Sequence, residues 1–340
     1  MAGKLPPEKL ERYVLSRCGV VDGSVIVGGG IGIDSAIIDL GNGLMLAMHS
    51  DPITGAVELL GWLAVNVVSN DIAVVGAKPR WLLSVLYLPE DLPDSVLDAI
   101  TVQIDEAAKE LGVTVIGGHT EYTPGLPRPM ITMTGVGIVV KNGPTLPSGA
   151  RAGDAVIVTK SVGLEGTAIL ATDFSETLRV KGVPQSIIES SRRFIKMVSV
   201  VRDALTLAEA GLATAMHDPT EGGLLGGLAE IAYASRKTIE VWEELIPIAE
   251  ETAAVCRALG IDPLKLISSG TLVATVPFER VGEAIELLSS RGIEARIVGR
   301  VREQSGSLVA LHRREGIVET VDRPYVRDEL FRLWEAKDHH

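Results

Sequence analysis

Carboxylates at the ends of apolar segments constrain the fold of this chain more than any other feature of its sequence. They stand beside glycine, proline or other small residues at Asp34, Asp51, Asp71, Glu121 and Asp218, in a chain that is 46% hydrophobic. Burying a lone carboxylate is costly. We therefore expect the fold to gather these segments around a shared cation, for which a hard divalent ion, Mg²⁺ or Mn²⁺, is the natural occupant. Such ions usually arrive with phosphate, so a nucleotide site is the first hypothesis.

Length and charge limit the other possibilities. The chain has 340 residues, more than one typical domain, and a formal net charge of −12. Its lysines and arginines form no basic stripe, so we expect no nucleic-acid partner. The apolar runs end well before the roughly 20 residues that a membrane span needs, and no signal peptide is visible. We expect a cytoplasmic protein without a membrane partner.

Two residue counts give weaker indications. Cys18 and Cys256 are the two cysteines and fit no CxxC pattern, so the sequence supports neither a disulfide framework nor a structural zinc site. Three glutamines and four asparagines are few for this length, and together with the charged-residue usage they fit a thermophile.

Apolar periodicity predicts a layered fold. Strands are expected at residues 24–27, 44–49, 82–88, 131–140, 155–159 and 271–276. Helices are expected at residues 58–75, 95–111, 164–172, 186–210, 221–235, 247–259 and 278–291, with Gly112 as a stop signal. Strands that alternate with helices favour an α/β class with α+β layers over a β-sandwich. A dense run of helix and strand breakers at 141–150 predicts domains at 1–148 and 149–320, followed by a tail at 321–340.

The glycine-rich segment at residues 28–34 is a candidate phosphate loop. It lacks the GxGxxG spacing, and no Lys-Ser/Thr pair follows it as a P-loop requires. Closely spaced glycines, including Gly30 and Gly32, nevertheless let backbone NH groups approach an anion. A tight turn between strands explains the glycines about as well, but Asp34 directly after them favours a metal and phosphate site.

Asp51 and Asp71 each allow two interpretations. Asp51 follows an apolar strand, where loops gather around a site, yet Asp-Pro is also a common way to open a turn. Asp71 lies beside Asn70 in an apolar helix, and Asn66 is four residues earlier on the same face. These polar groups need partners, which are either a ligand or a buried hydrogen-bond network.

Three further motifs carry candidate residues. Lys78 can meet a phosphate or complement the end of a helix. His119 can bind a metal, transfer a proton or be an ordinary core histidine. Asp218 and Gly222 precede a helix whose first NH groups either attract an anion or are simply capped. The sequence contains no metalloprotease, α/β-hydrolase or protein-kinase signature.

In this order and spacing, the motifs resemble the aminoimidazole ribonucleotide (AIR) synthase superfamily, and within it most closely the hydrogenase-maturation carbamoyl dehydratases, HypE. The matching segments are Gly30–Ala36, Asp51–Ile53, Asn70–Pro79, Gly117–Thr120, Asp154–Val158, Asp218–Gly223 and Leu259–Leu272. Each segment is short, but the ordered set, spread over about residues 20–300, is specific.

The resemblance implies an N-terminal α/β domain that dimerises through its strands and a C-terminal α/β domain packed against it. It also implies that ATP and a divalent metal lie in a cleft near the dimer interface. The metal ligands are then expected at Asp34, Asp51, Asp71 and Glu121, and the catalytic residues at Asp71 and His119. Nucleotide contacts are expected from Gly30, Gly32, Asn70, Lys78, Thr120, Asp218 and Gly222.

The sequence departs from the family pattern in two places. His119 stands where the family usually has Asp or Glu, which weakens one metal ligand and shifts the preference toward Mn²⁺, although Glu121 can compensate. The HypE enzymes end in a Pro-Arg-Ile-Cys tail whose cysteine carries the substrate carbamoyl group. This sequence has no cysteine after Cys256, so we expect that covalent step to be absent.

Three hypotheses for function follow. The first is a metal-dependent phosphatase or NTPase acting on nucleotides or a small phosphorylated metabolite, with ions that neutralise charge on the phosphate and His119 moving a proton. The second is ATP-dependent activation of an amide or carbonyl oxygen on a separate substrate, which predicts ATP turnover only when that substrate is present. The third is a non-catalytic nucleotide sensor or maturation scaffold, which predicts stabilisation by ATP without product.

Overall fold

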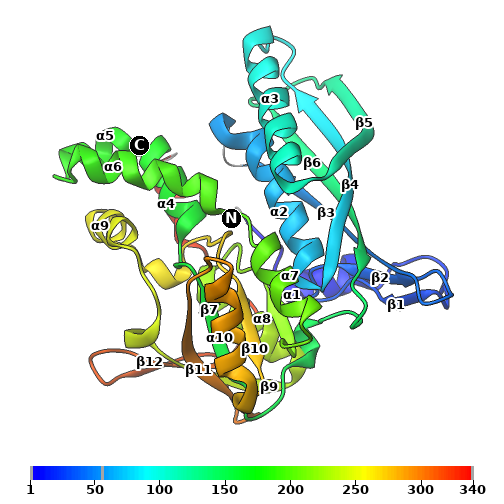
Figure 1. The fold of residues 1–340 in the computed structure, drawn as a ribbon. Helices are drawn as coiled ribbons and strands as arrows, with labels where there is room; N and C mark the ends of the chain where they lie inside the picture. The colour runs from blue at the N-terminus through cyan, green and yellow to red at the C-terminus, as the bar shows by residue number, and fades with distance from the viewer. Residues whose placement is uncertain (1–2, 55–56, 338–340) are drawn as a thin grey trace.

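The protein has two layered halves, each built on one β-sheet (Figure 1). The computed structural model describes residues 3–54 and 57–337. Helices pack on both sheets, and most neighbouring strands are antiparallel. This mixed architecture confirms the predicted α/β class with α+β layers.

The N-terminal half contains a six-stranded sheet in the order β1-β2-β3-β6-β4-β5. Its strands are β1 (Val25–Val27), β2 (Ala36–Asp39), β3 (Met45–Ile53), β4 (Ala77–Leu88), β5 (Thr114–Tyr122) and β6 (Met130–Val139). The pair β4 and β5 is parallel, and β5 lies at the edge of the sheet because it is the last strand in this order. All nine residues of β5 are exposed in the single chain.

Two helices cover this sheet. Every residue of α2 (Leu60–Val74) is buried, as expected of a helix that is apolar on nearly every face. It packs on β3, β4 and β6, and α3 (Asp94–Leu111) packs on α2. The helix α3 ends at Gly112, which adopts the left-handed conformation with φ 67°, so the predicted stop is confirmed.

The C-terminal half contains a seven-stranded sheet in the order β13-β12-β9-β11-β7-β10-β8. Its strands are β7 (Ala155–Thr159), β8 (Ala215–His217), β9 (Lys237–Trp242), β10 (Val273–Val276), β11 (Ala295–Glu303), β12 (Val309–His312) and β13 (Val318–Val321). Its helices are α4 (Leu164–Asp173), α5 (Ser175–Val180), α6 (Gln185–Arg192), α7 (Val201–Glu209), α8 (Gly223–Ser235), α9 (Glu250–Leu259) and α10 (Val281–Ser290).

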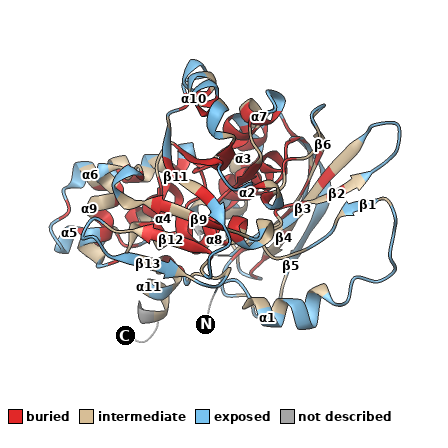
Figure 2. Ribbon diagram, turned by 90° about the horizontal axis from the view of Figure 1, so that it is seen from below, coloured by how far each residue is buried: buried red, intermediate tan, exposed pale blue. Residues whose placement is uncertain are grey.

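The two halves share buried surface. One core cluster joins α2 and α3 to α4, and another joins the end of α2 to α7 and α10. Figure 2 shows this buried material as one region through the middle of the molecule, with β1 exposed at its margin. The predicted domain boundary at 148/149 lies within a 3₁₀ turn, Pro147–Gly149, and stays a prediction.

Hydrogen bonds from α2 explain a break in the predicted helix at residues 186–210. The structure divides that stretch into α6, a 3₁₀ turn and α7. Asn70 Nδ2 donates to the carbonyl of Val198 at 2.8 Å, and the amide of Val200 donates to Asn70 Oδ1 at 2.8 Å. Because Asn70 satisfies these two backbone groups, the chain can leave the helix between them without burying an unpaired donor or acceptor.

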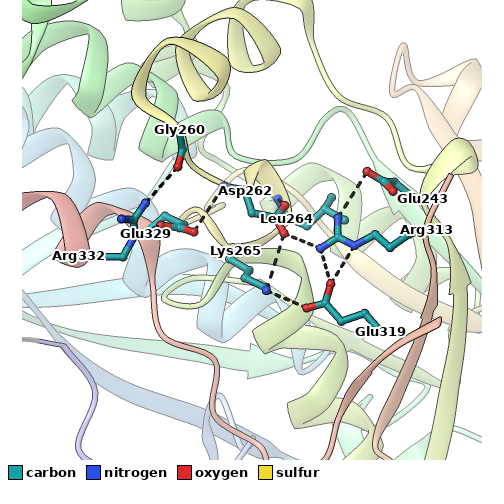
Figure 3. Close-up of polar contacts among 9 residues, drawn as sticks. All are labelled: Glu243, Gly260, Asp262, Leu264, Lys265, Arg313, Glu319, Glu329 and Arg332. Atoms are coloured by element: carbon teal, nitrogen blue, oxygen red, sulfur yellow. Dashed lines mark hydrogen bonds and ion pairs between the residues drawn. The ribbon is translucent and has the colours of Figure 1, made fainter. Parts of the chain in front are cut away.

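Residues 321–337 are folded onto the C-terminal half. They include α11 (Glu329–Lys337), and Leu330 within it is buried. A charged network holds the neighbouring hairpin of β12 and β13: Arg313 binds Glu319, Asp262 and Glu243 (Figure 3). Among residues 3–54 and 57–337, no helix has the length and apolar character to cross a membrane.

Candidate active site

A cavity of about 390 Å³ lies where the two halves meet, and four aspartates line it. Asp34 precedes β2, Asp51 lies within β3, and Asp71 lies in the last turns of α2. The fourth, Asp218, follows β8 in the other half. The structure thus brings together in one cavity three of the four predicted metal ligands and three predicted nucleotide contacts, Gly30, Gly32 and Asp218.

The carboxylates crowd one another. Burial and the nearby charges of Asp51, Asp34 and Asp218 raise the pKa of Asp71 well above its usual value. Burial also raises the pKa of Asp51, against a smaller opposing effect of His49. His49 Nε2 lies 3.5 Å from Asp71 Oδ2. The cavity therefore has an excess of negative charge that favours a bound cation or proton.

Asp218 is positioned by α2. Asn70 Nδ2 donates to its Oδ2 at 2.8 Å, while its Oδ1 is buried without a hydrogen-bond partner among the described residues. Burial raises the pKa of Asp218 to about 8, even though the Asn70 bond favours the charged form. An acceptor oxygen without a donor is one expected to meet a ligand.

A buried histidine links Asp34 to helix α8. His217 Nδ1 lies 2.6 Å from Asp34 Oδ1, and His217 Nε2 lies 2.8 Å from Glu230 Oε2. Burial opposes a charge on this imidazole, but the carboxylates of Asp34 and Glu230 outweigh it and raise its pKa to about 10. A protonated His217 offsets part of the negative charge.

The glycine turn forms one wall of the cavity. Residues 30–33 line it, and the amide of Ile33 donates to the carbonyl of Gly30 at 3.3 Å. Gly32 has φ +71° and packs so closely on α8 that a Cβ there would lie 2.9 Å from the backbone oxygen of Glu230. Both Gly30 and Gly32 therefore line the same cavity as the aspartates, and their role as a phosphate loop stays a prediction.

The donor set fits a hard divalent cation. Its ligands are carboxylate oxygens, and Asp34 Oδ2 and Asp218 Oδ1 are both buried without a hydrogen-bond partner in the described part of the chain. As they stand, no three acidic, histidine or cysteine side chains among the described residues enclose a single point. Asp34 is turned toward His217, so binding an ion requires small side-chain rotations.

Several predicted residues lie elsewhere in the single chain. His119 and Glu121 are exposed on β5, where His119 Nε2 lies 3.1 Å from Glu121 Oε2. Thr120 lines a separate groove between β5 and α3, and Lys78 is exposed on β4. The structure does not bring these four residues to the aspartates of the same chain, and their proposed roles stay predictions.

Two predicted nucleotide contacts have partners within the protein. Asn70 does not line the cavity, and its amide bridges the two halves as described above. The amide of Gly222, at the start of α8, donates to Asp328 Oδ2 at 2.7 Å. The helix N-terminus does attract an anion, but in this structure that anion is a carboxylate of the chain itself.

The double glycine before His119 has a structural reason. Gly118 has φ +146°, and a Cβ there would lie 1.8 Å from the backbone oxygen of Ser84 on β4. The close parallel pairing of β4 and β5 thus requires glycine at residue 118, independently of any role of His119. Cys18 is exposed and does not line the cavity, and Cys256 is buried.

Lys4, His217 and Glu230 belong to the site but were not predicted from the sequence. Glu230 connects the other two, since its Oε1 lies 3.0 Å from Lys4 Nζ. His217 had a local signal, because it directly precedes Asp218-Pro219. Lys4 and Glu230 are separated by more than 200 residues, and no local pattern marks their contact.

Comparisons with known proteins agree with this arrangement. The N-terminal domain model of the AIR synthase related proteins matches residues 32–139, and the C-terminal domain model matches residues 151–311. A putative hydrogenase expression/formation protein of Methanocaldococcus jannaschii is 32% identical over 322 residues, which cover 90% of this chain and 91% of that protein. The carbamoyl dehydratase HypE of Azotobacter vinelandii is 34% identical over 247 residues, 71% of this chain and 69% of that enzyme.

Solved structures show the same fold. Escherichia coli HypE, a hydrogenase maturation protein, aligns with a TM-score of 0.72 at 27% identity and covers 84% of this chain and 87% of its own. A HypE chain from a HypE–HypF complex aligns with a TM-score of 0.69 at 26% identity, over 86% and 94%. The two matched domains, their order and the shared fold lead to one conclusion: this chain belongs to the AIR synthase related protein family and is similar to HypE.

Proposed function

We propose that this protein is an enzyme that uses ATP to activate an amide or carbonyl oxygen on a separate substrate. The observation that carries the proposal is the convergence of four aspartates from both halves with the glycine turn in one cavity. Relatives that match over two thirds of their length are carbamoyl dehydratases. A HypE structure in complex with ATP shares the fold at 24% identity. These relatives support ATP-dependent activation better than the phosphatase hypothesis, which is the first of the three hypotheses from the sequence.

Each part of the cavity has a role in this proposal. Asp34, Asp51 and Asp71 would hold Mg²⁺ or Mn²⁺, which when bound neutralises charge on the phosphates. Asp218 would complete the site from the other half of the molecule. The backbone at residues 30–33 would face the phosphate chain, where close-set amides suit an anion.

A homodimer formed through β5 is part of the proposal. An exposed strand edge with apolar residues is a ready surface for a second chain, and Val115, Ile116 and Tyr122 are exposed along β5. Such a dimer also offers a place for His119 and Glu121, which the single chain holds away from its own aspartates. In this proposal, His119 and Glu121 take part in a cavity only when two copies of the chain are paired.

ATP turnover in the presence of Mg²⁺ or Mn²⁺ tests the proposed function. The reaction should start when a small amide or carbamoyl compound is added, and Asp71→Asn should lower it by roughly a hundredfold or more, the scale of one lost electrostatic contact to the reacting group. Asp98→Asn, on the exposed surface of α3, is the matched control.

Three outcomes separate the hypotheses. Turnover that requires the amide compound supports the proposal. Phosphate release without any acceptor supports the phosphatase or NTPase hypothesis and contradicts the proposal. Stabilisation by ATP with no product under any of these conditions favours the sensor or scaffold and rejects an enzymatic role.

A further inference from the structure

The segment before α1 (Pro7–Leu10) forms one side of the candidate active site. Lys4, Leu5, Pro7 and Leu10 all line the cavity that holds the aspartates. The backbone amide of Lys4 donates to Glu221 Oε2 at 2.6 Å, which fixes the segment beside the start of α8.

An ion pair holds the side chain of Lys4 in place, but not all of its hydrogen-bond donors have a partner in it. Its ammonium lies 3.0 Å from Glu230 Oε1, and the other oxygen of Glu230 lies 2.8 Å from His217 Nε2. An ammonium group has three donors, and Glu230 accepts one of them. Because 44% of the side chain remains exposed, the other donors can reach a ligand in the cavity.

Lys4 is the only lysine or arginine among the described residues that line this cavity. The other ionisable groups there are five carboxylates, two histidines and the phenol of Tyr325. Burial opposes the charge of Lys4, but Glu230, Glu221 and Asp34 outweigh it and raise its pKa, so the ammonium stays protonated. A polyphosphate entering so acidic a cavity needs more positive charge than one divalent ion supplies.

We propose that Lys4 is a phosphate-contacting residue: its ammonium donates to the terminal phosphates of a nucleotide bound in the cavity, and the N-terminal segment is the cover that carries it there. The inference rests on the proposed function, because it assumes a nucleoside triphosphate as ligand. It adds that the chain recognises the phosphate end of that ligand with a residue outside both family-matched domains.

A structural role gives a different expectation. If Lys4 only anchors the segment to Glu230, its loss loosens the cover and weakens every nucleotide alike. If it contacts the terminal phosphates, its loss weakens ATP and spares AMP. The comparison of the two nucleotides therefore separates contact from anchoring.

The test measures ATP and AMP binding to the full chain by calorimetry with Mg²⁺, for wild type, Lys4→Gln and Lys4→Arg. Lys4→Gln should weaken ATP by ~10- to 100-fold, the range for a lost hydrogen bond to a charged group, with AMP unchanged. Lys4→Arg should retain part of the affinity, since the charge is kept. The control is Lys9→Gln, on the exposed side of α1 and away from the cavity.

Each other outcome overturns the inference. Equal losses for ATP and AMP show that Lys4 anchors the segment, and unchanged ATP affinity in Lys4→Gln shows that it makes no contact; in both cases ATP binding by the wild type leaves the proposed function standing. Failure of the wild type to bind ATP with Mg²⁺ or Mn²⁺ rejects the proposed function and this inference with it.

Discussion

At the scale of single residues, the carboxylates in the cavity repel one another, and a bound cation can reduce that repulsion. Asp34, Asp51, Asp71 and Asp218 are brought together, and only Lys4 and His217 among the described residues of the cavity have raised pKa values that keep a compensating positive charge. The raised pKa values of Asp51, Asp71 and Asp218 mean that the folded protein holds protons it would lose on unfolding. A divalent cation can replace those protons, so pH and metal should act on the same groups.

Stability without metal should fall as the pH rises from about 4 to about 8. The pKa of Asp218 is raised to about 8 by burial, so the folded state binds this proton more tightly than the unfolded state. The stabilisation from this proton is fully present below the pKa of Asp218 in the unfolded state. It is lost as the pH rises through the pKa of Asp218 in the folded state. Thermal unfolding in chelator at pH 5 and pH 8 measures the loss.

Asp218→Asn isolates this group, because the amide keeps the shape and cannot ionise. The variant should lose less stability between pH 5 and pH 8 than the wild type, and Mn²⁺ at pH 8 should restore the wild type more than the variant. A pH dependence identical in both proteins would show that Asp218 does not titrate as the structure predicts.

At the scale of elements, α2 joins the two halves and positions the site at the same time. Its Asp71 faces the cavity, while Asn70 bridges to Val198, Val200 and Asp218. A helix buried on every side can carry such polar groups only if each finds a partner. The bridge fixes Asp218 relative to Asp71 across the domain boundary.

Asn70→Ala should therefore destabilise the protein by about 2–6 kcal/mol, because buried backbone groups at Val198 and Val200 lose their partner at about 1–3 kcal/mol each. Asn66→Ala is the matched control: Asn66 is equally buried in α2 but makes one local bond, to the carbonyl of Trp62. Urea unfolding of both variants measures the difference. Equal losses in the two variants would mean that the bridge adds nothing beyond burial.

At the scale of the whole molecule, β5 is an edge strand whose residues are all exposed in the single chain. We expect the protein to run at twice its mass of 36.0 kDa in a light-scattering measurement, and Ile116→Lys on β5 to shift it toward the monomer. Ile317→Lys is the matched control, because Ile317 is as exposed as Ile116 but lies next to β13. A monomeric wild type, or dissociation by both variants alike, would reject the β5 interface.

The sequence predicts those parts of the fold that depend on local pattern. The long apolar segments at β3, β4, β6 and α2 are placed correctly, since periodicity and burial agree there. The edge strand β5 and the strands β9, β11, β12 and β13 were not predicted. Each mixes polar and charged residues with apolar ones, and only pairing with distant strands makes them regular.

The candidate site divides in the same way. Asp34, Asp51, Asp71 and Asp218 were found because each stands at the end of an apolar segment, which is a local signal. Lys4, His217 and Glu230 were missed as site residues because their positions depend on contacts across more than 180 residues or on neighbours in another element. His119 and Glu121 show the opposite problem: a motif can match a family while one chain alone does not bring it to the site.

The central claim is that acids distant in sequence converge on an ion in a nucleotide cavity. Anomalous diffraction from crystals grown with Mn²⁺ and a non-hydrolysable ATP analogue tests it most directly. The account predicts a manganese peak within coordination distance of carboxylate oxygens from at least two of Asp34, Asp51 and Asp71, with the analogue phosphates beside residues 30–33. Manganese bound elsewhere, or a cavity without it, would contradict the account.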